Sequence, residues 1–128
     1  MFSPDPTRRT WAAKFADAFR GTWEGVRGQS SFRVHTVVAV LVIAAAAFLQ
    51  VAAWEWCVLV LCITAVFVSE LFNSALERLA KAVDREHNSL IGAALDIASA
   101  AVLWAAVGAA AVGFVILGPH AWQLWRGE

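Results

Sequence analysis

The segment WCVLVLCITAVFVSELFNSALERLAKA, residues 56–82, joins an uncharged apolar run to a polar second half. The apolar part, residues 56–69, is too short to cross a bilayer alone, because a transmembrane helix needs about 20 residues. Glu70, Asn73 and Glu77 follow it at helical spacing. The periodicity therefore predicts one long helix that continues to the end of this segment.

Two further apolar runs flank the segment. The first covers residues 36–53, and the second covers residues 90–117 and is interrupted only by Asp96. Gly118 and Pro119 follow the second run, and we expect the helix to end there. Of the 128 residues, 60% are hydrophobic and 16% are charged, whereas about 25% charged residues are usual in soluble domains. The sequence therefore predicts an all-α membrane protein with three transmembrane helices.

The stretch before the first apolar run has a different pattern. Aromatic residues recur there at every fourth position, with charged residues between them: Trp11, Phe15, Phe19 and Trp23. This pattern is typical of an amphipathic helix that lies in the membrane interface. We therefore expect an N-terminal segment with a surface helix (residues 1–34), a three-span transmembrane domain (35–118) and a short tail (119–128).

The distribution of charge predicts the orientation in the membrane. Basic residues precede the first span and lie between the second and third spans, whereas residues 50–56 contain none. Because cytoplasmic loops carry an excess of Lys and Arg, we expect a multi-pass protein with its N-terminus and second link in the cytoplasm. The 10 basic and 10 acidic residues balance, which argues against a nucleic-acid partner.

The polar residues inside the apolar helices suggest a functional site. Glu70, Asn73 and Glu77 share one helix face, and Asp96 enters the third helix at a similar depth. Carboxylates within a membrane are costly and often functional, and such oxygen-rich sets suit Mg²⁺ beside a bound phosphate. The alternative is a packing network in which Asn73 bonds across the helices and the carboxylates pair with Arg78 or Lys81.

Several segments together resemble one known family. They are ELFNSALE at 70–77, DREHNSLIG at 84–92, DIASAAV at 96–102, GTWEG at 21–25 and FRVH at 32–35. This set is similar to the signature of the small prokaryotic integral-membrane diacylglycerol kinase and undecaprenol kinase family. The short connection between Arg27 and Phe32 resembles the undecaprenol kinase branch more closely.

The resemblance implies an ATP-dependent lipid kinase of the bacterial inner membrane that forms a homotrimer with sites shared between subunits. Undecaprenol is the first expected lipid alcohol and diacylglycerol the second. By position in the motif, Glu70 would be the general base, Asn73 would orient the reacting groups, and Glu77 would bind Mg²⁺ at the ATP phosphates. The resemblance also assigns residues near the nucleotide: Lys14, Glu86, Asn88 and Asp96.

Three positions depart from the family pattern. A second metal-binding glutamate of the family aligns with Gln29. Its amide can still offer one oxygen to the metal, but without the negative charge the metal affinity should fall. A lysine before the family's aspartate aligns with Leu95. Lys81 replaces a residue that is commonly acidic in the family. Lys81 is one helical turn from Glu77, so it could supply the missing cation near the nucleotide. The simpler alternative, which needs no special geometry, is that Lys81 extends to the interface or pairs with Glu77 or Asp84.

Two other classes of function therefore stay open on the sequence alone. One is a catalytically silent homologue that binds nucleotide or lipid, and the other is a small transporter that uses the buried carboxylates. No glycine-rich phosphate loop is present, so helices and their links would have to hold any nucleotide. We assign His35 only an interfacial role and expect Ser69 to bond its own helix.

Overall fold

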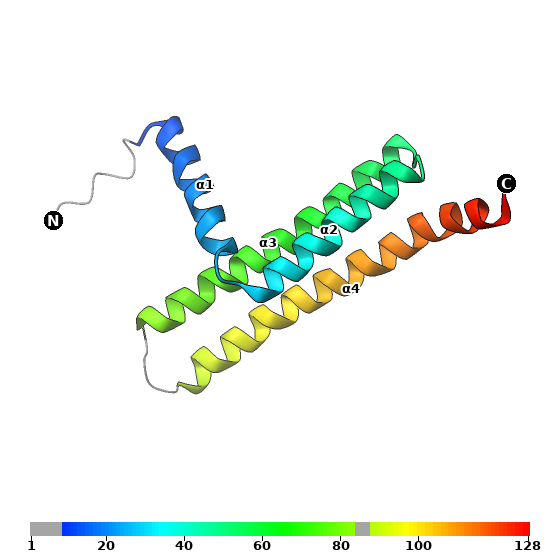
Figure 1. Cartoon of the computed structure of the whole chain (residues 1–128). Helices are drawn as coiled ribbons and strands as arrows, with labels where there is room; N and C mark the ends of the chain where they lie inside the picture. Colours follow the sequence, from blue (N-terminus) through cyan, green and yellow to red (C-terminus); the bar gives the residue numbers. More distant parts are fainter. Residues whose placement is uncertain (1–8, 84–87) are drawn as a thin grey trace.

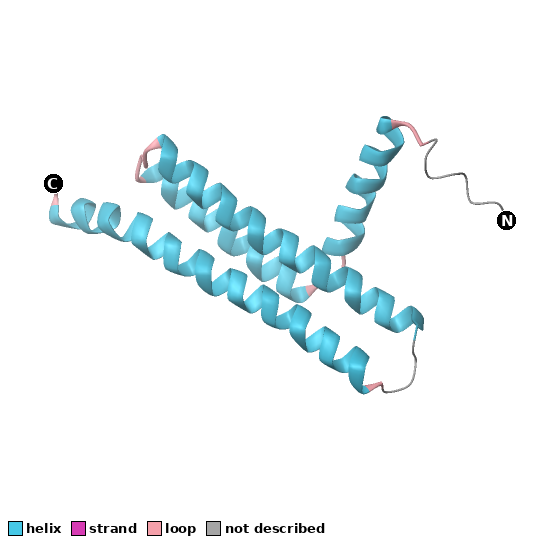
Figure 2. Cartoon of the chain, turned by 180° about the vertical axis from the view of Figure 1, so that it is seen from behind, coloured by secondary structure: helices cyan, strands magenta, loops and turns pink. Residues whose placement is uncertain are grey.

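The computed structural model describes residues 9–83 and 88–128. Every element in these ranges is a helix: α1 (Trp11–Val26), α2 (Ser30–Phe48), α3 (Ala53–Val83) and α4 (Ser89–Arg126). Helices α2, α3 and α4 lie side by side as a bundle, and α1 leaves the bundle at a steep angle (Figures 1 and 2). The predicted all-helical architecture is confirmed.

Three helices are long and apolar enough to span a membrane, which agrees with the three predicted spans. Helix α2 has 19 residues, or about 28 Å at 1.5 Å per residue, close to the roughly 30 Å of a hydrocarbon core. Helices α3 and α4 have 31 and 38 residues, about 46 and 57 Å. Their ends must therefore extend beyond the apolar layer.

A tight turn joins α2 to α3. Gln50 in this turn adopts a left-handed backbone conformation, with φ at 53°. A small cluster of buried apolar side chains packs beneath the turn: Ala46, Val51, Leu59 and Ile116. Because Ile116 comes from α4, this cluster fixes all three bundle helices at the end where α2 meets α3.

The predicted end of the last helix was wrong. Helix α4 continues through Pro119 and ends at Arg126, where Gly127 caps it with a φ of 74°. A proline removes one backbone donor and crowds the preceding turn, but it does not always end a helix. Beyond the proline, His120 contacts Glu55 on α3, and this contact holds the final turns of α4 against the bundle.

Helix α1 is anchored to the bundle at its C-terminal end. Gly25 is buried there, and a Cβ atom at this position would lie 2.5 Å from Leu71 Cδ2. Ser74 Oγ donates to the Gly25 carbonyl oxygen at 3.4 Å, and the Arg78 guanidinium donates to the Glu24 carboxylate at 3.2 Å. The four aromatic side chains of α1 remain exposed. Their contact with a membrane surface stays a prediction.

Candidate functional site

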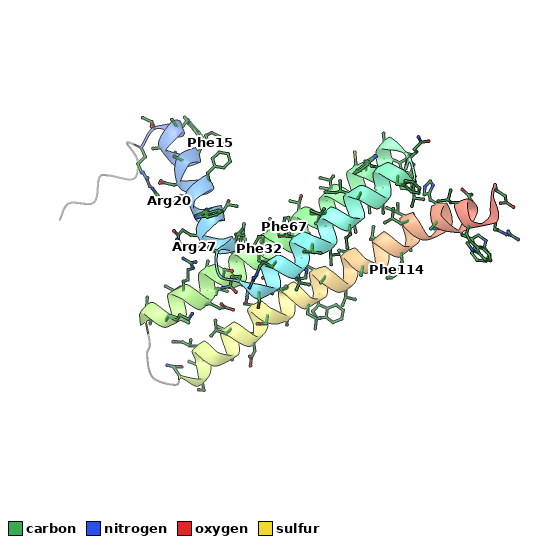
Figure 3. The ribbon with its side chains drawn as sticks, viewed as in Figure 1. Phe15, Arg20, Arg27, Phe32, Phe67 and Phe114 are labelled. Atoms are coloured by element: carbon green, nitrogen blue, oxygen red, sulfur yellow. The ribbon has the colours of Figure 1, made fainter. Side chains whose placement is uncertain are left out.

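The first turns of α2 place two side chains on the carboxylate of Glu70. Ser31 Oγ donates to Glu70 Oε2 at 3.2 Å, and His35 Nε2 lies 3.0 Å from Glu70 Oε1. The two helices are aligned here because Phe32 of α2 stacks on Phe67 of α3 with ring centroids 5.2 Å apart (Figure 3). Glu70 is only 1% exposed, so α2 and α3 enclose the carboxylate almost completely.

His35 is closer to the site than we expected. Its side chain is 22% exposed and faces Glu70 at ion-pair distance, which an interfacial role alone did not predict. The angles of this contact are not those of a hydrogen bond, so Glu70 Oε1 still lacks a donor. The spacing Ser31 to His35 is one helical turn, which brings both side chains to one face of α2.

A cavity of about 290 Å³ opens beside Glu70 between α2, α3 and α4. Its lining residues are Ser31, His35, Glu70, Asn73, Ser99, Val102, Leu103 and Ala106. Our sequence reasoning missed Ser99, although it lies three residues after Asp96 and therefore on a neighbouring part of the same helix face. We call this volume the polar cavity.

Two buried acceptor atoms near the polar cavity have no hydrogen-bond donor in the described part of the chain. They are Glu70 Oε1 and Asn73 Oδ1. An unmet buried acceptor costs about 1–3 kcal/mol, and more when it is charged. Both residues line the cavity, so a ligand that brings a hydroxyl group there could satisfy one or both oxygens.

The predicted metal ligand Glu77 lies two turns further along α3 and is half-buried. Gln29 Nε2 donates to its Oε2 at 3.3 Å, and Asn73 Nδ2 donates to its Oε1 at 3.1 Å. Each amide would present an oxygen instead if its end group turned by 180°. One carboxylate and two amides are hard oxygen donors, so these residues fit Mg²⁺, which keeps waters or phosphate oxygens as its other ligands.

The packing network that we considered as an alternative forms only in part. Asn73 bonds to Glu77 within α3, whereas Arg78 pairs with Glu24 of α1 and not with either carboxylate of the site. Within residues 9–83 and 88–128, no ion pair joins Lys81 to Glu77. The carboxylates of Glu70 and Glu77 are therefore not neutralised by the basic residues of their own helix.

The remaining predicted residues lie apart from the polar cavity. Lys14, Lys81 and Asp96 are exposed, and the Lys14 ammonium lies 4.6 Å from the centre of the Trp11 ring. Asn88 caps the first turn of α4, where its side chain accepts from Leu90 N at 2.9 Å. Glu86 lies outside the described residues. The structure thus brings together Glu70, Asn73, Glu77 and Gln29. It leaves Lys14, Lys81, Asn88 and Asp96 on the surface of the single chain.

A second, apolar cavity of about 590 Å³ runs between the three bundle helices. Its lining is almost entirely aliphatic and aromatic, with small residues such as Ala109, Ala110 and Gly113 on the α4 side. His35 and Ala106 line both cavities. The polar cavity therefore adjoins an apolar volume that extends along the bundle.

Comparison with known proteins gives a consistent result. A family model described as prokaryotic diacylglycerol kinase matches residues 16–117. Undecaprenol kinase of Bacillus subtilis is 32% identical over 105 residues, which cover 82% of this chain and 85% of that protein. Diacylglycerol kinase of Synechocystis sp. is 39% identical over 107 residues, covering 80% and 61%, respectively. Diacylglycerol kinase of Escherichia coli K12 is 31% identical over 103 residues, covering 77% and 84%.

Proposed function

Because this chain belongs to the prokaryotic diacylglycerol kinase family, we propose that it transfers the γ-phosphate of MgATP to the hydroxyl of a membrane lipid alcohol. Undecaprenol is the first candidate and diacylglycerol the second, since relatives named for each match at 31 to 39% identity. The observation that carries the proposal is the buried Glu70 carboxylate, which has an oxygen without a donor beside a cavity.

The proposed reaction uses Glu70 as the general base. Its Oε1 accepts the proton of the lipid hydroxyl while the alcohol oxygen forms a bond to the γ-phosphorus. The bond from that phosphorus to the bridging oxygen of ADP breaks, so the products are a lipid phosphate and ADP. Phosphoryl transfer depends mainly on positioning and on neutralised charge, and a well-placed base contributes about 10²-fold or more.

The two adjoining cavities support a lipid rather than a water-soluble alcohol. A substrate whose hydroxyl reaches Glu70 in the polar cavity would carry its hydrocarbon chain into the apolar cavity. Burial of apolar surface there contributes roughly 25 cal/mol per Å². The residues shared by the two cavities, His35 and Ala106, would then lie beside the junction of head and tail.

We propose that Glu77, Asn73 and Gln29 hold Mg²⁺ with the ATP phosphates. The ion would neutralise charge on the transferring phosphate. Only one of these three side chains carries a negative charge, so this chain would bind the metal more weakly than a site with two carboxylates. Lys14, Lys81, Asp96, Asn88 and Glu86 are proposed to lie around the nucleotide.

The exposed positions of Lys14, Lys81 and Asp96 favour an assembly in which neighbouring subunits complete the site. In each of the three long apolar helices, at most 22% of an apolar stretch of 18 residues is buried within one chain. Extensive apolar surface therefore remains for partner chains or lipid. We therefore propose a homotrimer in the bacterial inner membrane. Its N-terminus would be cytoplasmic, so that ATP reaches the end of the bundle where α1 and Glu77 lie.

A catalytically silent homologue is the second candidate, and the substitutions at Gln29 and Leu95 are the observations that favour it. The amide of Gln29 bonds to Glu77, which uses a carboxylate oxygen that a metal would need. If this reading holds, the double substitution Gln29→Glu with Leu95→Lys should create activity that the natural chain lacks.

The direct experiment is transfer of radiolabelled γ-phosphate from ATP by the purified protein in mixed micelles with each lipid alcohol. We expect a labelled lipid phosphate, with undecaprenol preferred over diacylglycerol. If diacylglycerol is preferred, the proposed kinase activity stands and its lipid substrate is diacylglycerol. If neither the natural chain nor the double variant labels either lipid, the kinase proposal fails, and a binding role takes its place.

A further inference from the structure

We propose that His35 is a positioning residue for Glu70: its imidazole supports the ionised carboxylate and keeps Glu70 Oε1 directed toward the substrate hydroxyl. The inference rests on the proposed function and adds a residue to it. His35 approaches Oε1 to 3.0 Å, whereas Ser31 donates to the other oxygen, Oε2. The two neighbours on α2 therefore act on different oxygens of one carboxylate.

The need for such a neighbour follows from burial. Glu70 is 1% exposed within a helix that is long and apolar enough to span a membrane. An ionised carboxylate in such a place is costly unless a charge or several donors compensate it. Among the side chains of residues 9–83 and 88–128 that can carry a positive charge, only His35 lies within ion-pair distance of Glu70.

No other charged group competes for His35 in the described residues. From α3 the charged residue that it faces is Glu70, with the neutral amide of Asn73 in the same lining, and on its own helix Ser31 shares the polar cavity. From α4 the shared lining contributes the hydroxyl of Ser99 and the small side chain of Ala106. Glu70 is therefore the one charged partner of the His35 side chain within the described residues.

A second His–Glu pair in the same chain, between His120 and Glu55, lies away from the polar cavity and serves as a comparison. His120 Nε2 lies 3.0 and 3.1 Å from the two carboxylate oxygens of Glu55 in hydrogen-bond geometry, and Ala52 N also donates to Oε1. Both oxygens of Glu55 are thus engaged. At Glu70 the imidazole stands beside Oε1 without a hydrogen bond, and this buried oxygen, in a residue that lines the polar cavity, accepts no hydrogen bond from the described residues. A general base needs a carboxylate oxygen that is free to accept a proton, whereas a carboxylate that only links two helices does not.

The kinetic test compares His35→Leu, which removes both donor and charge, with His35→Gln, which keeps an N–H donor. We expect His35→Leu to lower kcat about 10-fold or more, a share of the roughly 10²-fold or more that a base supplies, with KM for MgATP unchanged. His35→Gln should recover part of the loss. The same change at the second pair, His120→Leu, should leave kcat intact below its unfolding temperature.

A double-mutant cycle separates positioning from independent effects. If His35 acts through Glu70, His35→Leu should cause no further loss of kcat in the Glu70→Gln background. The proposal would be overturned if the losses of kcat in the two single variants multiplied in the double variant. It would also be overturned if His35→Leu kept full activity, or if its sole effect were a raised KM for MgATP.

The same variants give a readout that does not need activity. Thermal unfolding in one detergent should show coupling, such that the shifts of His35→Leu and Glu70→Gln do not add in the double variant. Absence of lipid phosphorylation by the natural chain would refute the proposed function, and coupled unfolding would then still support the His35–Glu70 contact. Additive unfolding shifts would refute the contact itself, whatever the activity.

Discussion

At the scale of single residues, the amide of Gln29 changes the balance of charge around Glu77. Gln29 and Asn73 both donate to this carboxylate, so two neutral groups occupy oxygens that a cation would otherwise share. Affinity for Mg²⁺ depends on the number and charge of oxygen ligands. Metal binding in this chain is therefore expected to rest mainly on Glu77 and the substrate phosphates.

Removal of Glu77 tests this dependence. We expect Glu77→Ala to weaken Mg²⁺-dependent ATP binding strongly, because no second carboxylate from α2 remains to share the metal. Isothermal titration of ATP with and without Mg²⁺ measures the effect. Metal dependence equal to that of the natural chain would contradict the assignment and direct attention to Asp96.

Addition of a carboxylate at position 29 tests the same site in the opposite direction. Gln29→Glu should lower the Mg²⁺ concentration needed for half-maximal turnover, and Mg²⁺ should then raise the thermal unfolding midpoint of the variant by linkage. The control is Gln123→Glu, the same substitution at an exposed position near the far end of α4. If both variants respond alike to Mg²⁺, position 29 is not part of the metal site.

At the scale of helices, the pair Glu55–His120 fastens the N-terminal end of α3 to the C-terminal end of α4. It lies beyond Pro119 and next to the turn that begins α3. Breaking a satisfied pair leaves the partner without its acceptor or donor. This link therefore stabilises the part of α4 that we had expected to be outside the helix.

Substitution of this glutamate should affect stability and not chemistry. We expect Glu55→Gln to lower the thermal unfolding midpoint, because it removes the charge that faces His120, while turnover per folded molecule stays near the natural value. Circular dichroism and the phosphate-transfer assay measure the two quantities. An unchanged midpoint would mean that the pair contributes little, and a selective loss of turnover would connect it with the distant site.

Much of this helix arrangement was predictable from the sequence. Apolar runs of the right length predicted the three long helices, and the spacing of Glu70, Asn73 and Glu77 placed them on one face. The predicted helix end at Pro119 was wrong because contacts of the following turn, such as that of His120 with Glu55, outweigh the tendency of proline to end a helix. The contacts of His35 with Glu70 and of His120 with Glu55 join residues 35 and 65 positions apart, so they depend on how whole helices rotate against one another.

At the scale of the whole molecule, the residues assigned to the site lie partly inside the bundle and partly on its surface. Glu70 and Asn73 line the polar cavity, whereas Asp96 lies on the exposed surface of α4. Helix α1 likewise carries exposed aromatic residues away from the bundle (Figure 1). A trimer with α1 on the cytoplasmic membrane surface would use both features.

Subunit mixing tests the shared site. We expect Glu70→Gln and Asp96→Asn chains to be inactive alone and to regain part of the activity when they are unfolded, mixed and reassembled. A neighbour's intact Asp96 would then complete a site that holds an intact Glu70. Reassembled mixtures that stay inactive, while reassembled natural chains recover, would confine each site to one subunit.

Cysteine labelling tests the orientation. In a chain without Cys57 and Cys62, a thiol placed at Ala53 should react from outside the cell, and one placed at Val83 should react only after the membrane is permeabilised. The basic residues on the second link and before α2 predict this result. The opposite pattern would put the site out of reach of cytoplasmic ATP.

The central claim is that Glu70 takes the proton from a lipid hydroxyl in a site that binds MgATP. The most direct measurement compares phosphate transfer and MgATP binding in the natural chain and in Glu70→Gln, which keeps the size of the side chain and removes its charge. The account predicts a loss of turnover of about 10²-fold or more with nucleotide binding largely retained. Near-normal turnover in Glu70→Gln would contradict it.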